Sequence, residues 1–272
     1  MISKIQLKRK DGSVIFEYEV KNNSIKKTVK AYIKQERASG KEIVDLTNAN
    51  LHNAVLQGID LSNTNLCSAD LIGANLEGSN LFNAVLYKAN LNNSNLKNAD
   101  LSDCNLKYAD LHNAVLCKSI LTEANLFCAN LSNTNLNGAN LNCTILSFAD
   151  LNNTDLTDAD LSNADLRFAD LSGANLTNAS LIRTNFNYAD LSDANLKNAL
   201  LNDTKLHSVR LTDANLEDAS LHDVDLTFSN LSNAKLINTY LCNTDLSNAD
   251  LTKVNLNEAN LDCVTCVGAK FS

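Results

Sequence analysis

Hydrophobic residues recur along most of the chain with a period of five. Within residues 46–261, 43 of the 44 positions at this spacing are leucine, and the exception is Phe186. Two residues before each of them lies a small or β-branched residue, which over residues 44–269 is alanine in 27 of 46 units. The residue between is Asp or Asn in 32 of the 46. Two variable, mostly polar residues complete the unit, as in Ala-Asp-Leu-Ser-Asn at 159–163.

A period of five fits neither an α-helix nor a straight β-strand. On an α-helix the leucines would drift around every side, and in a strand an odd spacing would send alternate leucines to opposite faces. The leucines can share one core only if the chain turns by the same amount in every unit and coils around its own axis. The pattern therefore predicts an all-β solenoid.

The aromatic residues predict how many units make one coil. Those that lie two residues after a leucine are separated by multiples of 20: Tyr108, Phe148, Phe168, Tyr188 and Phe228. Four units per coil would place them above one another. With coils separated by the usual interstrand distance of about 4.8 Å, the repeats would form about eleven coils and a rod roughly 55 Å long.

Residues 1–43 break the period and have a pattern of their own. Apolar and polar residues alternate on both sides of Asp11-Gly12, a pair typical of tight turns, and this predicts a β-hairpin. A helix should follow, beginning after Ser24 and ending near Gly40. Because the end of a solenoid exposes core and unpaired backbone, we expect this ββα segment to cap the rod.

The tandem Ala-Asp/Asn-Leu-x-x units, over about residues 44–271, resemble the pentapeptide-repeat proteins. The resemblance implies a right-handed quadrilateral β-helix in which the leucine and the preceding small residue face inward. The expected domains are an N-terminal hairpin-plus-helix cap over 1–43 and a β-helix over 44–272. At the inward small position Ile59 is the residue we expect to be strained, because close-packed cores tolerate added methylenes poorly.

Charge divides the chain unevenly. The net charge is −8, but residues 1–43 hold 11 basic and 5 acidic residues, which leaves −14 for the rest. Sorted by their place in a twenty-residue coil, the outward residues give the four sides net charges near 0, −5, −2 and −7. No stretch is apolar enough to span a membrane and the start lacks a signal-peptide pattern, so we expect a cytoplasmic protein with reduced cysteines.

The neutral side carries an aromatic stripe. Its residues are Tyr87, Tyr108, Phe127, Phe148, Phe168, Tyr188 and Phe228. Packing against the cap, or of the rings on one another, would explain it structurally. A contiguous exposed apolar strip is otherwise a surface for protein binding or self-association.

The next side carries a column of acidic residues. They are Asp70, Asp110, Asp150, Asp170, Asp190 and Asp250. Stacked carboxylates could bind a hard cation or imitate a phosphate backbone. The alternative is that they are solvated corner residues of the repeat.

The sequence offers little catalytic or metal-binding chemistry. In Cys263-x-x-Cys266 one side chain should point outward and the other inward, and no second cysteine pair lies nearby. Asp203, His207 and Ser208 are triad-like in order, but a leucine-filled rod leaves no pocket for them. We therefore expect no cofactor, no metal and no enzymatic activity.

Two functions from different classes compete. The first is a non-enzymatic scaffold that binds an unidentified protein through the aromatic side or the bare C-terminal end. That end resembles the dimerisation ends of some family members, which implies a homodimer. The alternative is a DNA-mimic protein that binds DNA gyrase or another DNA-binding enzyme, as some family members do. Direct nucleic-acid binding by the basic helix is opposed by the acidic rod.

Overall fold

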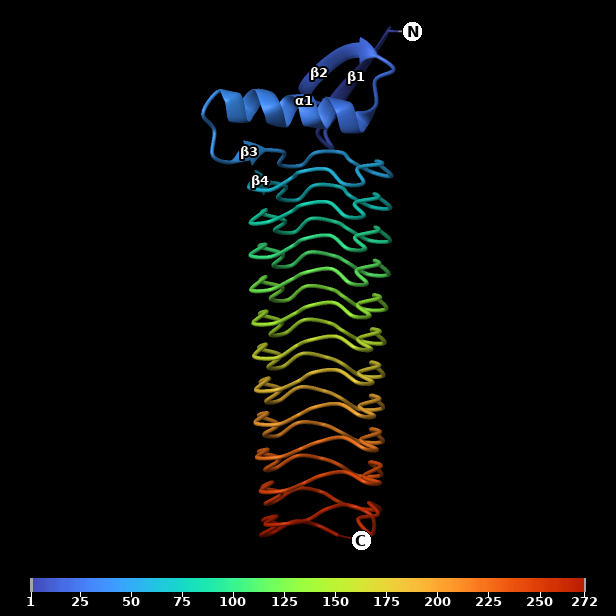
Figure 1. Cartoon of the computed structure of the whole chain (residues 1–272), viewed down its shortest axis with the longest axis vertical. Coiled ribbons are helices and arrows are strands. Elements are labelled where there is room, and N and C mark those ends of the chain that lie inside the picture. Colours follow the sequence, from blue (N-terminus) through green and yellow to red (C-terminus); the bar gives the residue numbers. More distant parts are fainter. Residues whose placement is uncertain (1, 272) are drawn as a thin grey trace.

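A computed structural model describes residues 2–271, which form a straight rod with a small α/β segment across one end (Figure 1). The chain runs from this N-terminal segment to the far end of the rod without interruption. The named elements are β1 (Ile2–Lys8), β2 (Val14–Lys21), α1 (Ile25–Ala38), β3 (Val44–Asp45) and β4 (Thr64–Asn65).

The rod is a solenoid in which one coil takes twenty residues. Strand β3 pairs in parallel with β4, and beyond them single-residue parallel bridges join residues twenty apart, such as Asn50 to Asp70 and Asp70 to Asn90. Each coil therefore holds four five-residue units, as the spacing of the aromatic residues predicts. A turn in every unit leaves little extended backbone, which is why long strands are absent from the described part of the rod.

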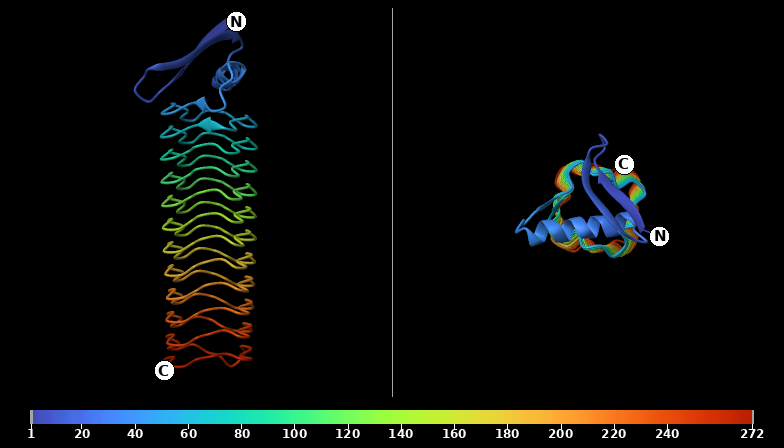
Figure 2. Two further views of the ribbon diagram at one scale, coloured as in Figure 1. Left: turned by 90° about the vertical axis from the view of Figure 1, so that its left-hand side faces the viewer. Right: turned by 90° about the horizontal axis from the view of Figure 1, so that it is seen from above.

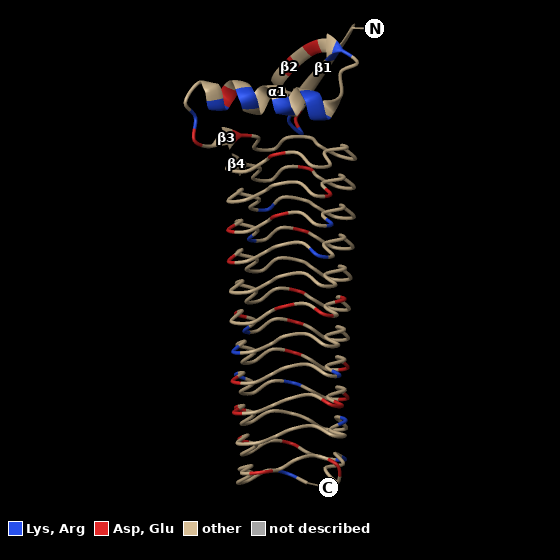
Figure 3. Cartoon of the chain, in the orientation of Figure 1, with Lys and Arg blue, Asp and Glu red and all other residues tan. Residues whose placement is uncertain are grey.

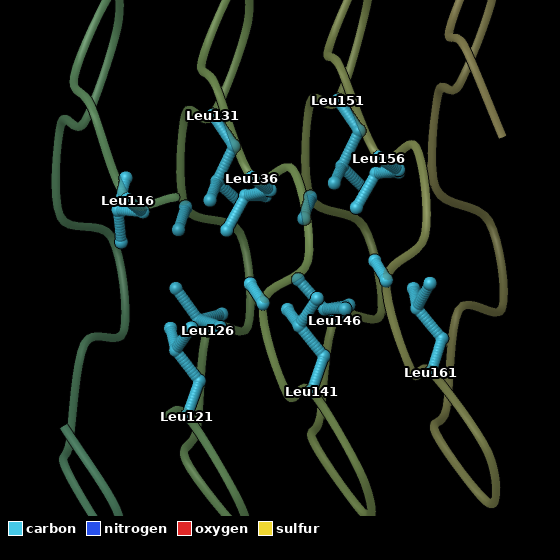
Figure 4. Packing of buried hydrophobic residues seen from close by; sticks show 14 of the residues in the cluster. Leu116, Leu121, Leu126, Leu131, Leu136, Leu141, Leu146, Leu151, Leu156 and Leu161 are labelled. Carbon is cyan, nitrogen blue, oxygen red and sulfur yellow. The ribbon is translucent and has the colours of Figure 1, made fainter. Parts of the chain in front are cut away.

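The leucines fill the axis of the rod. Figure 4 shows leucines from opposite walls of successive coils pointing toward one another, and from Leu46 to Leu251 these residues are at most 1% exposed. Phe186 occupies the same kind of position and is fully buried. The small residues line the same column, and Ile59 lies fully buried among them.

Each unit closes with a β-turn that requires left-handed backbone. The N–H of the small residue donates to the carbonyl of the leucine three residues before it, as from Thr154 to Leu151 at 3.1 Å. The residue just before the small one has a positive φ, for example 55° at Asn153. Asparagine and glycine adopt this conformation at least cost, which explains how often they stand there.

All five backbone N–H groups of the unit 149–153 have acceptors, and one of these acceptors is the side chain at the Asp/Asn position. The Asp150 N–H donates to the preceding coil, and those of Leu151 and Asn153 donate to the following one, at 2.7 to 3.0 Å. The Asn152 N–H has no carbonyl in reach and donates to Asp150 Oδ1 at 3.0 Å. The carboxylate or amide thus completes the hydrogen bonding of the turn.

The N-terminal segment, residues 2–43, lies across the first coil, and Figure 2 shows α1 spanning the end of the rod. Strands β1 and β2 form an antiparallel hairpin, and Ser24 Oγ accepts the Lys27 N–H at the start of α1. Leu7 and Val29 are fully buried in the same core as the first leucines of the rod. Arg37 donates to Asp60 Oδ2 at 2.6 Å across the junction.

Candidate protein-binding surface

The outward rings of one side form a continuous ladder along the rod. Its members, which we call the ring ladder, are Tyr87, Tyr108, Phe127, Phe148, Phe168, Tyr188, His207 and Phe228. Phe148 stacks on Phe168 with centroids 4.8 Å apart, and Phe168 stacks on Tyr188 at 5.0 Å. The remaining neighbours meet edge to face at 5.5 to 5.8 Å, a geometry that aromatic pairs favour.

Five rings of the ladder are open to solvent, and among the described residues the ring contacts of the N-terminal segment stay within that segment. Relative exposures at Tyr108, Phe148, Phe168, Tyr188 and Phe228 range from 46 to 59%. Of the two structural explanations given above, the structure supports stacking of the rings on one another. Even stacked, they leave about half of each of these five side chains exposed.

Five of the rings stand on left-handed backbone. Tyr108, Phe148, Phe168, Tyr188 and Phe228 occupy the turn position most often held by asparagine, aspartate or glycine, with φ between 58 and 65°. A bulky L-residue pays about 1 to 2 kcal/mol for this conformation. Exposed aromatic residues that recur in this strained backbone conformation are candidates for function.

His207 belongs to the ring ladder and was missing from the stripe expected from the sequence. Its ring lies 5.6 Å from Tyr188 and 5.5 Å from Phe228, and thereby joins them. His207 Nδ1 lies 2.7 Å from Thr227 Oγ1, within hydrogen-bond distance. The twenty-residue register that aligns the Phe and Tyr residues also places His207 on their side, so counting imidazole as a ring would have found it.

The carboxylates of the acidic side run beside the ring ladder. Asp110, Asp150, Asp170 and Asp190 each lie two residues after a ring, in four Tyr/Phe-Ala-Asp sequences. The backbones of Asp150, Asp170 and Asp190 pair directly from coil to coil. This places a column of negative charge along one edge of the ring ladder.

The six acidic residues differ in their partners. Asp70, Asp190 and Asp250 face His52, Arg210 and Lys270 at 3.7, 2.9 and 2.9 Å, respectively. Hydrogen bonds from Thr252, together with Lys270, lower the pKa of Asp250 to about 2.

Asp110, Asp150 and Asp170 have no basic side chain within 4.0 Å among residues 2–271. In these three, Oδ1 accepts a backbone N–H from two residues further along the chain. Their charges are therefore available beside the rings.

A shallow hollow of about 310 Å³ adjoins the middle of the ring ladder on the side away from these carboxylates. Its lining is Phe127, Ile145, Ser147, Phe148, Asp165, Arg167 and Phe168. Arg167 donates twice to Asp165, from Nε at 2.8 Å and from a terminal nitrogen at 2.7 Å. The hollow thus combines apolar walls with an ion pair whose charges balance.

The triad-like residues are directed to separate partners. Asp203 lies 3.9 Å from Arg183, and His207 Nδ1 contacts Thr227. Cys263 and Cys266 are both exposed. Among the described residues no three His, Cys, Asp or Glu side chains gather closely enough to hold a metal ion.

Basic residues concentrate on α1 and acidic residues along the rod, as Figure 3 shows. Lys26 donates to the Gln57 carbonyl, Lys27 to the Asn22 carbonyl at 2.7 Å, and Arg37 to Asp60. Part of the positive charge of α1 is therefore used within the chain. None of the helices in the described part of the chain is long and apolar enough to cross a membrane.

The last coil leaves core positions open. Leu261 is 41% and Phe271 54% exposed, whereas leucines in the middle of the rod are fully buried. A hollow of about 190 Å³ opens there, lined by Leu246, Leu251, Leu256, Leu261, Val264, Cys266 and Phe271.

Comparisons with solved structures found other repeat proteins. HetL, a pentapeptide repeat protein involved in heterocyst differentiation regulation in the cyanobacterium Nostoc, is 29% identical over 88% of this chain and 92% of its own, with a TM-score of 0.35. A thylakoid-lumen pentapeptide repeat protein of Arabidopsis thaliana is 31% identical over 36% of this chain and 69% of its own, with a TM-score of 0.36.

QnrB1, a plasmid-mediated fluoroquinolone resistance protein, is 17% identical over 59% of this chain and 85% of its own, with a TM-score of 0.37. A search among curated proteins found no match. The family model described as Pentapeptide repeats matches in eight copies, which together cover residues 45–82, 84–227 and 229–272. The chain therefore belongs to the pentapeptide-repeat family and has that family's right-handed β-helix solenoid.

Proposed function

We propose that this protein is a non-enzymatic scaffold that binds a protein partner through the ring ladder. The observation that carries the proposal is the series of half-exposed aromatic side chains on left-handed backbone, from Tyr108 to Phe228. The repeat does not need them, because asparagine or glycine fits this turn position at lower cost. Their burial by a partner would remove apolar surface from water at roughly 25 cal/mol per Å².

Capture with the double variant Phe148→Asn and Phe168→Asn tests this function. Asparagine is the most frequent residue at this position, so the variant should keep the fold. The matched control is Phe82→Asn with Tyr240→Asn, which removes two exposed rings, 41 and 55% exposed, from another side of the rod. We expect partner proteins captured from a native extract by the wild type and the control to be lost with the ladder variant. Equal capture by all three would refute the proposal.

We further propose that a second copy of the chain pairs at the last coil, while the N-terminal segment caps the first. The support is the exposure of Leu261 and Phe271 around the terminal hollow. Light scattering across a range of protein concentrations should report a dimer mass that Leu261→Asp reduces to that of a monomer. A concentration-independent monomer mass in the wild type would exclude this pairing.

The acidic sides support the DNA-mimic alternative. Net charges near −7 and −5 lie on opposite sides of the rod. Such a surface would occupy the DNA-binding groove of gyrase or another DNA-binding enzyme. Gyrase supercoiling measured with added protein checks it, and absence of inhibition or protection at micromolar concentration would remove this alternative.

A further inference from the structure

We propose that the ring ladder and the carboxylate column beside it form one site for an extended, arginine- and lysine-containing segment of a partner protein. This inference rests on the proposed function and specifies the chemistry of the partner. Rings attract cations to their faces, and adjacent carboxylates supply the counter-charge. The two features occur together in the four Tyr/Phe-Ala-Asp sequences that begin at Tyr108, Phe148, Phe168 and Tyr188.

Charge complementarity selects a basic partner over a neutral or acidic one. The side that bears the rings has a net charge near 0 and lies between sides of −7 and −5. Asp110, Asp150 and Asp170 have no cation of this chain in ion-pair contact among the described residues. A basic segment on the rings would supply the missing partners without displacing an existing ion pair.

The chain itself places a cation on the first ring of the ladder. Lys88 Nζ lies 5.2 Å from the centroid of Tyr87, within the usual range of a cation–π contact. Rings further along the ladder lie on the same side of the rod, and the acidic column begins to flank them at Asp110. Arg167, the nearest guanidinium to Phe168 in sequence, is held by Asp165.

The length of the ladder sets the length of the segment. The seven centroid separations between Tyr87 and Phe228 total about 38 Å. An extended chain advances about 3.3 Å per residue, so a segment of about twelve residues would cover every ring. Each ring added to the contact adds apolar area, and a ring whose face is not covered by a neighbour also adds a potential cation–π partner; Phe168, stacked on both Phe148 and Tyr188, contributes apolar area alone.

Binding of a twelve-residue peptide of alternating Arg and Ser tests the proposal. The comparison peptide carries citrulline in place of every arginine, which keeps the shape and removes the charge. The chain contains no tryptophan, and three of its six tyrosines lie in the ladder, so its intrinsic fluorescence comes from tyrosine and includes the ladder. We expect the Arg peptide to bind and change this fluorescence, and the citrulline peptide to bind at least tenfold more weakly.

Two double variants separate the rings from the carboxylates. Asp150→Asn with Asp170→Asn removes charge but keeps an Oδ1 acceptor for the turn, and Phe148→Asn with Phe168→Asn removes rings. Each should weaken binding of the Arg peptide at least fivefold. Asp158→Asn with Asp218→Asn removes the same charge from the opposite side of the rod and should leave binding within twofold of wild type.

The outcomes that would overturn the proposal are distinct. Equal weakening by the opposite-side variant would show attraction to the acidic rod as a whole, and equal binding of the two peptides would show that charge plays no part. If the ring variant unfolds, the carboxylate variant still decides the matter. Loss of partner capture in the ring variant, with no binding of the Arg peptide by wild type, would refute the basic segment and leave the proposed function standing.

Discussion

Truncation of one leucine should destabilise the rod by an amount set by its place along the axis. Leu156 is fully buried, and its N–H donates to the Asn175 carbonyl at 2.7 Å, one of the bonds that hold the coils at fixed spacing. The walls around an alanine at this position cannot collapse without breaking such bonds. Leu156→Ala should therefore reduce the free energy of unfolding by about 3 to 5 kcal/mol, the upper part of the range for buried leucines.

Leu261 is the internal comparison, because it has the same position in the repeat but is 41% exposed. In the monomeric protein Leu261→Ala removes less buried surface and leaves no closed cavity, so at a protein concentration too low for pairing its cost should be about 1 kcal/mol. Urea unfolding followed by circular dichroism gives both values, and native-state hydrogen exchange locates the weakened coils. A loss below about 1 kcal/mol for Leu156→Ala, or equal losses for both variants, would refute a uniformly packed leucine column.

Four further predictions follow from individual contacts. Ser79→Ala and Ser94→Ala should each stabilise the rod by about 1 kcal/mol in thermal unfolding, because their buried hydroxyls have no partner. Ser119→Ala, which removes a hydroxyl bonded to the Leu116 carbonyl at 2.6 Å, should destabilise it. Asp150→Ala should cost about 1 kcal/mol by the same assay and Asp150→Asn almost nothing, since only alanine removes the acceptor of the turn. Burial raises the pKa of Cys104 to about 12, so mass spectrometry should find this thiol unmodified by iodoacetamide at pH 8 until the rod unfolds, while exposed Cys143 reacts. Thr252 and Lys270 lower the pKa of Asp250 from the ordinary value of 3.8 to about 2, so the stability that these bonds contribute is complete above the ordinary pKa and is lost as pH falls from there toward 2. Thr252→Ala should raise the folded-state midpoint in an NMR titration.

Most of the fold could be predicted from the repeat, because every unit must bury its leucine in the same way. A leucine at every fifth residue required a coil, and the alignment of Tyr108, Phe148 and Phe168 gave its twenty-residue length, which the bridges confirm. Handedness followed from the family resemblance, since periodicity alone is compatible with either hand. Sequence reasoning treated the corner Asp and Asn as solvated or as a charge column. Their hydrogen bonds to backbone N–H groups became visible only in three dimensions.

The sequence predicted where the candidate surface lies, but not all of its members or how they contact one another. Register placed the Phe and Tyr residues on one side, whereas their contacts, the inclusion of His207 and the exposure of about half of each of five rings depend on side-chain geometry. The backbone conformation of the rings adds information that residue type alone does not give. In a solenoid whose turns favour asparagine, a phenylalanine at φ near 60° is a local disadvantage that stacking offsets only in part. The same choice recurs at five positions, and an Asp follows four of them by two residues, so the proposed binding surface explains it better than the stability of the rod does.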